Sequence, residues 1–430
     1  MAKWRIIGIM TGNSMDAIDA VLTEFDGEKI RDICSYSEPY DAEQKAAMSG
    51  LRRRVIEAKM TAADMLKDAL FMNVHWKYIE GVANAVNNMC AKYGLQKQQI
   101  DAIGFHGKTL DHNPPSVAAK NKEAPFTTQM GSAQLLANMT GIPVINDFRS
   151  ALLQNGFEGA PLAGPHNAHI AQIEGDGCYF NAGNTSNLAW INNGASQISW
   201  DAGPFNEYVD GWVRTYKNEA MDTDGAYGKK GRVQPALLQK LFDIGRAYYE
   251  LLPPKSGDPA YYHTDEIFAH ICTEYGNPQT NEHLFCNVMR TLEVFAGYIA
   301  AYALGQTPNN IEFIPNIVLF GGGWHNPVAL QAFKDCLSGK ATFILPEHRK
   351  FFEKLSARWP QRVKVKYSDF GTYMEARLFA DLARFYIEQK SWPLPELKGK
   401  EIILGNARYP FAGEVDDFLS KSARGWQNAK

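Results

Sequence analysis

Two short turns rich in glycine, amide and hydroxyl groups are the first candidates for chemistry. They are Gly12-Asn13-Ser14 and Gly183-Asn184-Thr185, and each stands between two segments with strand character. Backbone N–H groups and hydroxyls in such a turn form a concave site suited to a phosphate. The same residue types also favour an ordinary hairpin turn. A third turn, Gly321-Gly322-Gly323, follows the apolar segment 317–320, and three such turns in one chain strengthen the phosphate interpretation.

The carboxylates near these turns are the next candidates. Asp201 stands between a predicted strand and a helix that begins near Asn206. An aspartate there can act as a general base or hold a metal, or it can cap the helix, and the local sequence favours the cap. Asp16 follows the first turn, and Glu375 begins the last predicted helix. A carboxylate at a helix start complements the helix dipole, but it can also reach a cleft and hold Mg²⁺ through water.

Two histidines have ambiguous settings. His106 follows a buried strand and precedes Gly107, and His166 lies in a segment rich in glycine and proline. No set of histidine, cysteine and carboxylate residues has the spacing of a zinc site, so both histidines are interpreted as core or loop residues. The sequence has neither Gly-x-x-x-x-Gly-Lys-[Ser/Thr] nor Gly-x-Gly-x-x-Gly, which argues against a nucleotide site of either common type.

The elements that must position these residues alternate between strands and helices. Strands are predicted at 4–10, 17–25, 100–105, 143–149, 178–180, 187–191 and 317–320. Helices are predicted within 41–98 and at 130–139, 234–252, 282–304, 328–337 and 373–389. This alternation predicts an α/β protein. The strand–turn–strand unit at Gly12 recurs at Gly183, which suggests two related halves with a boundary near 150–175 and a ligand site in the cleft between them.

Composition narrows the class of protein. The 430 residues and 48.0 kDa predict two or three domains, and 45% hydrophobic with 21% charged residues is typical of a globular chain. A net charge of -3 provides no basic field for nucleic acid or an anionic membrane. The six cysteines form no Cys-x-x-Cys pair, and no uninterrupted apolar run approaches the about 18 residues of a membrane span. We therefore expect a cytoplasmic protein.

Many short motifs, taken in order, resemble the anhydro-N-acetylmuramic acid kinases and the related levoglucosan kinases. Residues 7–19 resemble the family's opening Gly-x-Met-Ser-Gly-Thr-Ser-x-Asp-Gly-Ile-Asp, and 200–206 resemble Phe-Asp-Thr-Gly-Pro-Gly-Asn. The resemblance continues at 104–109, 147–149, 159–162, 224–225, 253–256, 321–327 and 374–376. It covers almost the whole chain.

The resemblance implies the two-domain sugar kinase/Hsp70/actin fold, which is ribonuclease H-like and has duplicated βββαβα-type halves. The implied domains are 1–160, with a helical insertion, and 161–430, with ATP and a sugar in the cleft between them. The implied cofactors are ATP and Mg²⁺, and the implied assembly is a homodimer.

The resemblance also assigns roles to individual residues. Asp201 would be the catalytic base, activating a water that attacks C1 of a 1,6-anhydro sugar while O6 takes the γ-phosphate. The residues implied to bind ATP are Gly12, Asn13, Ser14, Asp16, Gly183, Asn184, Thr185, Gly321, Gly322 and Gly323. Those implied to bind substrate are His106, Asp147, Arg149, Glu158 and Asn206, and those implied to bind the metal are Asp16 and Glu375.

Some positions depart from the family pattern. Lys108 stands where the family has glutamine, and Phe205 stands where it has a small residue. The sequence therefore predicts an ATP-dependent kinase of 1,6-anhydro-N-acetylmuramic acid acting in peptidoglycan recycling. The alternatives are a kinase of another anhydro or amino sugar and a catalytically inactive homologue that binds a nucleotide or a sugar.

Overall fold

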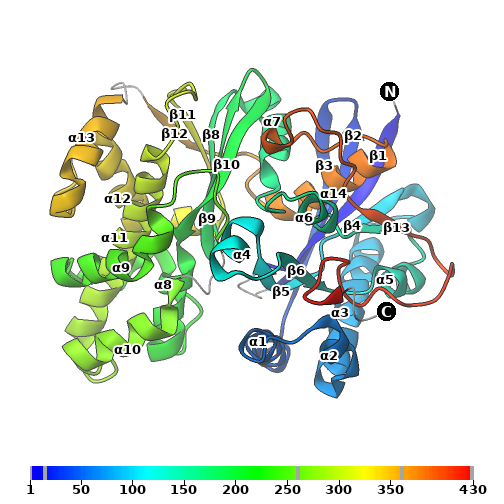
Figure 1. The fold of residues 1–430 in the computed structure, drawn as a ribbon, viewed down its shortest axis with the longest axis horizontal. Helices are drawn as coiled ribbons and strands as arrows, with labels where there is room; N and C mark the ends of the chain where they lie inside the picture. Colours follow the sequence, from blue (N-terminus) through cyan, green and yellow to red (C-terminus); the bar gives the residue numbers. More distant parts are fainter. Residues whose placement is uncertain (1, 13–16, 258–261, 359–362, 427–430) are drawn as a thin grey trace. The chain divides into compact units, whose positions relative to one another are not determined.

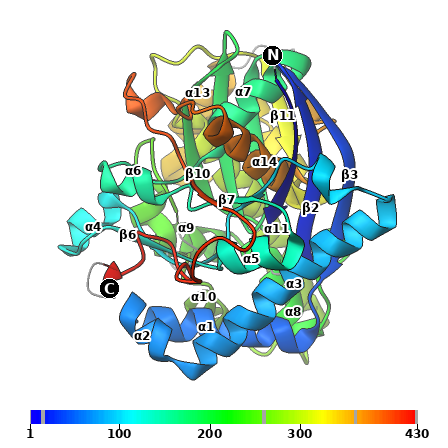
Figure 2. The ribbon, with the colours of Figure 1, turned by 90° about the vertical axis from the view of Figure 1, so that its right-hand side faces the viewer.

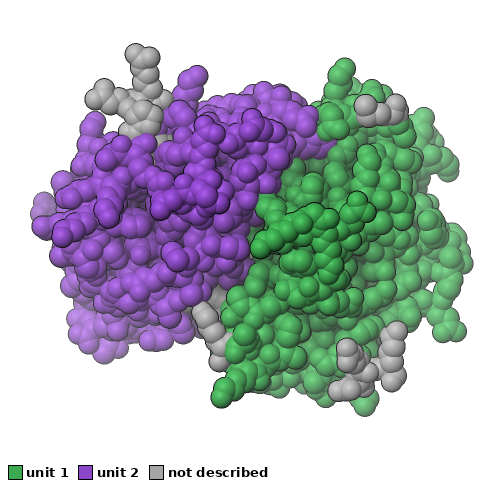
Figure 3. Space-filling view, turned by 45° about the horizontal axis from the view of Figure 1, so that its top comes forward, with its two compact units in different colours: residues 1–166, 373–430 green, residues 167–372 purple. Residues whose placement is uncertain are grey.

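The chain forms two compact units in a computed structural model that describes residues 2–12, 17–257, 262–358 and 363–426. Unit 1 comprises Met1–His166 and Tyr373–Lys430, and unit 2 comprises Asn167–Thr372 (Figure 3). These units differ from the partition expected at 160/161. The last segment belongs with unit 1 because its helix α14 (Met374–Ile387) packs on strands of the first sheet.

Unit 1 is built on a six-stranded sheet with the order β13-β7-β4-β1-β2-β3 (Figure 1). Strands β1, β2 and β3 form an antiparallel meander, while β4 runs parallel to β1 and β7 runs parallel to β4. The bounds are β1 Lys3–Met10, β2 Ala17–Asp26, β3 Lys29–Pro39, β4 Ala102–Phe105, β7 Val144–Asn146 and β13 Asn406–Arg408. A separate hairpin joins β5 (Lys108–Asn113) to β6 (Phe126–Met130).

Helices cover both faces of this sheet. The long helix α3 crosses β2 and β3 (Figure 2), and α5 packs beside it. On the other face α14 packs against β1, β2 and β4. The remaining bounds are α1 Ala42–Glu57, α2 Ala62–Lys67, α3 Ala69–Tyr93, α4 Pro115–Asn121, α5 Ala133–Thr140 and α6 Ser150–Gln154. The predicted helical region 41–98 is thus confirmed as three helices.

Two capping motifs explain where helices of this region begin and end. Asp41 and Gln44 form a capping box that starts α1, which satisfies N–H groups that the helix itself cannot pair. Helix α3 ends at Gly94, whose φ of 64° is the left-handed conformation that glycine adopts without steric penalty.

Unit 2 repeats the strand arrangement of unit 1. Its five-stranded sheet has the order β10-β9-β8-β11-β12, again an antiparallel meander followed by two parallel strands. The bounds are β8 Gly177–Ala182, β9 Thr185–Asn192, β10 Ala195–Pro204, β11 Asn316–Phe320 and β12 Lys364–Tyr367. The first five strands of the unit 1 sheet and the five strands of this sheet share the order third, second, first, fourth, fifth, and β13 is an additional edge strand in unit 1. The predicted fold class, an α/β protein with duplicated ribonuclease H-like halves, is confirmed.

The core of unit 2 forms around helix α11 (Glu282–Gly305), which contacts α8, α9, α12, α13 and β10. By length and composition α11 could cross a membrane, but 83% of its most apolar 18-residue stretch is buried inside the structure. The other helices are α7 Ala163–Glu174, which spans the boundary between units, α8 Asn206–Lys217, α9 Pro235–Tyr249, α10 Thr264–Tyr275, α12 Pro327–Ser338 and α13 Arg349–Arg358. Short 3-10 helices include Thr223–Gly225, Gly228–Lys230 and Gly322–His325.

Candidate active site

The turn between β8 and β9 is joined to the start of α8. The carbonyl of Gly183 accepts a hydrogen bond from the Asn206 N–H at 3.0 Å. The carbonyl of Asn184 accepts from the N–H groups of Phe205 at 2.7 Å and Glu207 at 3.3 Å. Helix N-terminal N–H groups need partners outside the helix, and the turn supplies them. The predicted phosphate turn and Asn206, a residue predicted to bind substrate, are therefore joined by backbone hydrogen bonds within unit 2.

The three glycines after β11 differ in how strongly their surroundings require glycine. Gly321 has a φ of 89°, and a Cβ there would lie 2.4 Å from Asn181 Oδ1. A Cβ on Gly323 would lie 2.6 Å from the Phe205 ring. Gly322 is exposed and a Cβ there would meet no atom within 4 Å, so packing inside this chain does not require a glycine at that position. An open glycine backbone between two fixed ones suits close approach by a ligand.

Phe205 fills the space beneath this glycine turn. Its side chain is 1% exposed, and its ring meets the Trp324 ring edge-on with 4.9 Å between centroids. The indole N–H of Trp324 donates to the carbonyl of Phe180 at 2.9 Å, which fixes that ring against β8. The larger residue at this family position is thus accommodated by packing against Trp324 and Gly323.

Asp201 lies on strand β10 and does not cap α8. The strand continues to Pro204 with an irregularity between Asp201 and Gly203, and the N-cap residue of α8 is Phe205, which makes no side-chain cap. The preference for a capping role is therefore wrong, because the chain stays extended beyond Asp201. Its carboxylate Oδ2 accepts hydrogen bonds from the Gly257 N–H at 2.8 Å and the Ser256 hydroxyl at 3.3 Å.

In unit 1, His106, Arg149 and Gly159 form one hydrogen-bonded network. The Nε–H of Arg149 donates to Nε2 of His106 at 2.9 Å, and its Nη1 donates to the Gly159 carbonyl at 2.7 Å. His106 Nδ1 faces the Gly107 carbonyl at 2.9 Å, so Nδ1 carries the proton. Three motifs separated along the sequence therefore meet at one arginine.

The electrostatics keep His106 neutral. Burial lowers the pKa of His106 well below its ordinary value, and the charges of Arg149 and Lys108 lower it further. A neutral imidazole whose Nε2 accepts from Arg149 orients the guanidinium. His106 thus has partners inside unit 1, and its role toward a substrate stays a prediction. His166 is also buried, and its Nδ1 lies 2.9 Å from Asp381 Oδ2.

Lys108 is a buried amine at the first glycine turn. It is 1% exposed, and its Nζ donates to the carbonyl of Gly12 at 2.9 Å. Burial lowers the pKa of Lys108 to about 7, the charge of Arg52 adds to that effect, and the charge of Glu375 opposes it. Glu375 is exposed in the first turn of α14. Asn13, Ser14 and Asp16 lie outside the described residues.

Asp147 and Glu158 are bound by neighbouring segments of unit 1. Asp147 has a φ of 60°, and its carboxylate accepts from the Ser150 hydroxyl and from the Lys421 N–H. Burial raises the pKa of Asp147 above its ordinary value. The carboxylate of Glu158 accepts from the N–H and hydroxyl of Ser116 at 3.1 Å and 2.8 Å. Both carboxylates have structural partners, and their roles toward a substrate stay predictions.

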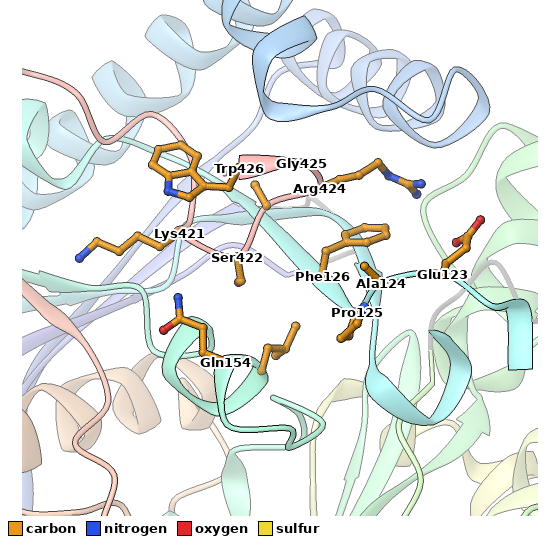
Figure 4. Close-up of a pocket in the computed structure, with 12 residues that line it drawn as sticks. Glu123, Ala124, Pro125, Phe126, Gln154, Lys421, Ser422, Arg424, Gly425 and Trp426 are labelled. Atoms are coloured by element: carbon orange, nitrogen blue, oxygen red, sulfur yellow. The ribbon is translucent and has the colours of Figure 1, made fainter. Parts of the chain in front are cut away.

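The C-terminal segment of unit 1 also lines a pocket of about 560 Å³ (Figure 4). The pocket is formed by residues 123–126, 153–154 and 421–426. None of the predicted site residues lines it. Lys421, which lines the pocket, donates its backbone N–H to the carboxylate of Asp147.

A buried pair of carboxyl groups in unit 2 was not predicted from the sequence. Glu293 on α11 is 0% exposed, and its Oε1 accepts from Asn326 Nδ2 at 2.7 Å. Asn326, three residues after Gly323, also caps α12. Burial raises the pKa of Glu293 to about 8, and the neighbouring Asp222 raises it too. A glutamate inside an apolar helical run was the available signal, because such a residue is rarely buried without a partner.

Glu293→Gln is expected to flatten the dependence of stability on pH. A folded-state pKa raised above the unfolded value gives stability that is complete below about pH 4.5 and is lost as pH rises through about 8. The wild type should lose about 2 kcal/mol more than the variant between pH 6 and 8. Urea unfolding at several pH values measures this, with the exposed Glu353→Gln as control. Parallel pH profiles for wild type and Glu293→Gln would contradict the assignment.

Comparison with known proteins places the chain in a family. The sequence profile named anhydro-N-acetylmuramic acid kinase matches residues 4–344. An anhydro-N-acetylmuramic acid kinase of Vibrio vulnificus is 27% identical over 398 residues, covering 92% of this chain and 95% of that protein. One of Rhizorhabdus wittichii is 30% identical over 353 residues, covering 81% of this chain and 86% of that protein.

Among solved structures, the (R)-2-hydroxyglutaryl-CoA dehydratase component A of Acidaminococcus fermentans is similar with a TM-score of 0.42 and 9% identity, covering 88% of this chain and 96% of that chain. The family assignment rests on the sequence matches, which extend over most of both units. The chain belongs to the anhydro-N-acetylmuramic acid kinase family.

Proposed function

We propose that this protein uses ATP to phosphorylate 1,6-anhydro-N-acetylmuramic acid while opening its anhydro bridge. The observation that carries the proposal is Asp201, a buried carboxylate with Oδ2 fixed by two donors, in the same unit as two glycine-containing turns. Family membership supports the substrate, since the relatives carry that sugar in their names. The place of this reaction would be the recycling of peptidoglycan fragments.

Asp201 is the proposed general base. It accepts a proton from a water molecule whose oxygen attacks C1 of the sugar, and the bond from C1 to O6 breaks. O6 takes the γ-phosphoryl group of ATP, giving the 6-phosphate of N-acetylmuramic acid, ADP and a proton. Positioned general bases of this type contribute about 10²–10⁴-fold to a rate. The hydrogen bonds to Oδ2 support this role because they fix the direction of the carboxylate.

The phosphates of ATP are proposed to lie at the glycine-containing turns. In unit 2 these are Gly183-Asn184-Thr185 and Gly321-Gly322-Gly323, and the exposed Gly322 supports close approach of the nucleotide. In unit 1 the proposed residues are Gly12, Asn13 and Ser14. Phosphoryl transfer requires chiefly positioning and charge stabilisation from the protein.

Magnesium is proposed to bind through few protein ligands. Among the described residues no group of three or more His, Cys, Asp or Glu residues could hold a metal ion. Mg²⁺ is usually held by one or two carboxylates together with substrate phosphates. Glu375, an exposed carboxylate, and Asp16 would hold it. When bound, the ion neutralises charge on the transferring phosphate.

The sugar is proposed to contact Arg149. The substrate carries a carboxylate on its lactyl group, and a guanidinium whose direction is fixed by His106 and the Gly159 carbonyl is the group that would recognise that carboxylate. His106, Asp147, Glu158 and Asn206 complete the proposed sugar-binding set. As part of the same proposal, the family resemblance supports a cytoplasmic homodimer. The net charge of -3 supports the proposal that it contacts neither nucleic acid nor membrane.

The test measures ADP release by the purified protein with ATP, Mg²⁺ and each of three sugars. These are 1,6-anhydro-N-acetylmuramic acid, levoglucosan and N-acetylglucosamine. We expect turnover on the first sugar, with a 6-phosphate product identified by mass spectrometry. Turnover only on another sugar would overturn the substrate assignment. ATP binding with no turnover on any of them would favour the inactive binding homologue.

A further inference from the structure

Lys255 is a buried amine that the proposed reaction does not use. It is 4% exposed, and its Nζ donates to the Tyr249 carbonyl at 2.9 Å and to Gln306 Oε1 at 3.0 Å. The Tyr248 carbonyl lies 3.4 Å away. Within the described residues Lys255 and Lys108 are the two lysines with buried side chains. A buried lysine is rare unless it has partners, so this position has a physical cause.

The partners of Lys255 lie at the end of helix α9. The last carbonyls of a helix have no partners inside it and carry the negative end of the helix dipole, which favours a cation. Gln306 extends this network, because its Nε2 donates to the carbonyls of Tyr249 at 2.8 Å and Leu251 at 3.2 Å. Lys255 and Gln306 therefore tie the loop after α9 to the helix end.

The same loop holds Asp201. The carbonyl of Lys255 accepts the Asp201 N–H at 3.0 Å, and the next two residues supply the donors to Oδ2, Ser256 and Gly257. Tyr248 closes the connection, since its hydroxyl donates to the Asp201 carbonyl at 2.9 Å and its ring lies 5.0 Å from the Lys255 amine. Lys255 thus connects two sites: its side chain binds the end of α9, and the next two residues of the same loop donate to the Asp201 carboxylate.

Electrostatic attraction also couples the Lys255 amine to the Asp201 carboxylate. Burial lowers the pKa of Lys255 to about 7, and the charge of Asp201 acts in the opposite direction. The ionised carboxylate therefore favours the protonated amine, and the protonated amine favours the ionised carboxylate. This coupling has the sign that a general base requires in its resting state.

We infer that Lys255 is a positioning residue for Asp201, anchoring the 255–257 loop to the end of α9 so that Ser256 and Gly257 direct the carboxylate. The inference rests on the proposed function for the role of Asp201 as base. A displacement of about 1 Å in a reacting group can lower a rate about 100-fold. Lys255 therefore acts on the chemical step and not on the binding of sugar or nucleotide.

Lys255→Met tests the inference, since it keeps chain length but removes the donors. We expect kcat to fall about 10–100-fold, with the KM values for sugar and ATP within about twofold of wild type. Lys255→Gln, which keeps an N–H donor, should recover part of kcat. Lys334→Met, exposed on α12, is the matched control and should match the wild type. Gln306→Leu serves if Lys255→Met does not fold: it removes the acceptor of the Lys255 amine and the Gln306 donors to the Tyr249 and Leu251 carbonyls, and it should lower kcat in the same direction.

A crystal structure of the Lys255→Met or Gln306→Leu protein supplies a readout that needs no activity. We expect the distance from Gly257 N to Asp201 Oδ2 to exceed 3.5 Å in the variant. An unchanged distance, or an unchanged kcat in a folded variant, would overturn the inference. Absence of wild-type turnover on all sugars would instead contradict the proposed function, and the crystallographic distance would still decide the role of Lys255.

Discussion

Asp201→Asn is expected to lower kcat about a thousandfold while the protein stays folded and still binds ATP. The substitution keeps the shape of the side chain and an acceptor oxygen for the Gly257 N–H, so the loop geometry survives. It removes the negative charge and the basicity that let the carboxylate take a proton from water. Because the effect falls on the chemical step, the KM for the sugar should change far less than kcat.

Steady-state kinetics and thermal melting measure the two halves of this expectation. The matched control is Asp243→Asn, an aspartate exposed on α9 in the same unit, which pairs with Arg246 at the surface. The control should retain wild-type kcat. If Asp201→Asn keeps near-full activity, the base is another group and the proposed mechanism is wrong.

Gly8→Ala is expected to destabilise unit 1 by at least about 3 kcal/mol. A Cβ on Gly8 would lie 1.8 Å from the carbonyl oxygen of Ala376, and one on Gly104 would lie 2.0 Å from that of Phe379. Both obstacles are backbone atoms of α14, so no side-chain rotation relieves the clash. The helix must move away from β1, and the buried contacts between them are lost.

Differential scanning calorimetry should show the Gly8→Ala transition lowered by about 6–12 °C, as follows from the size of the unit. Gly50→Ala is the control, since its Cβ would meet nothing within 4 Å and alanine favours a helix over glycine by about 0.5–1 kcal/mol. It should melt at or above the wild-type temperature. A Gly8→Ala protein that melts with wild type would mean that α14 does not pack closely on the sheet.

Local sequence patterns predicted much of the fold. The strand–turn–strand units at Gly12 and Gly183 are predictable because hydrophobic alternation and turn residues act over a few positions, and the matching strand orders confirm the two related halves. The helices 282–304 and 328–337 agree with α11 and α12 within one residue at each end. The chemistry of single residues was harder. Asp201 resembles a helix cap in its own sequence, and only the length of β10 excludes that role.

Contacts between distant segments set the rest. Arg149 binds His106, which lies 43 residues earlier, and Lys255 holds a loop against Asp201 through carbonyls that any residue type presents. Backbone carbonyls leave no signature in a sequence, so the anchoring of Lys255 could not be read from residue types. The membership of α14 in unit 1 is equally hidden, because it depends on glycines on β1 and β4 that lie more than 200 residues away.

The discontinuity of unit 1 affects the order in which the protein can mature during synthesis. Unit 2 is one continuous stretch, so all of its strands and helices have been synthesised before α14 begins. Until then the face of the first sheet that bears Gly8 and Gly104 stays uncovered. A chain that ends at residue 372 should therefore contain every residue of the second unit but only part of the first, and the uncovered apolar sheet face is a natural target for chaperones.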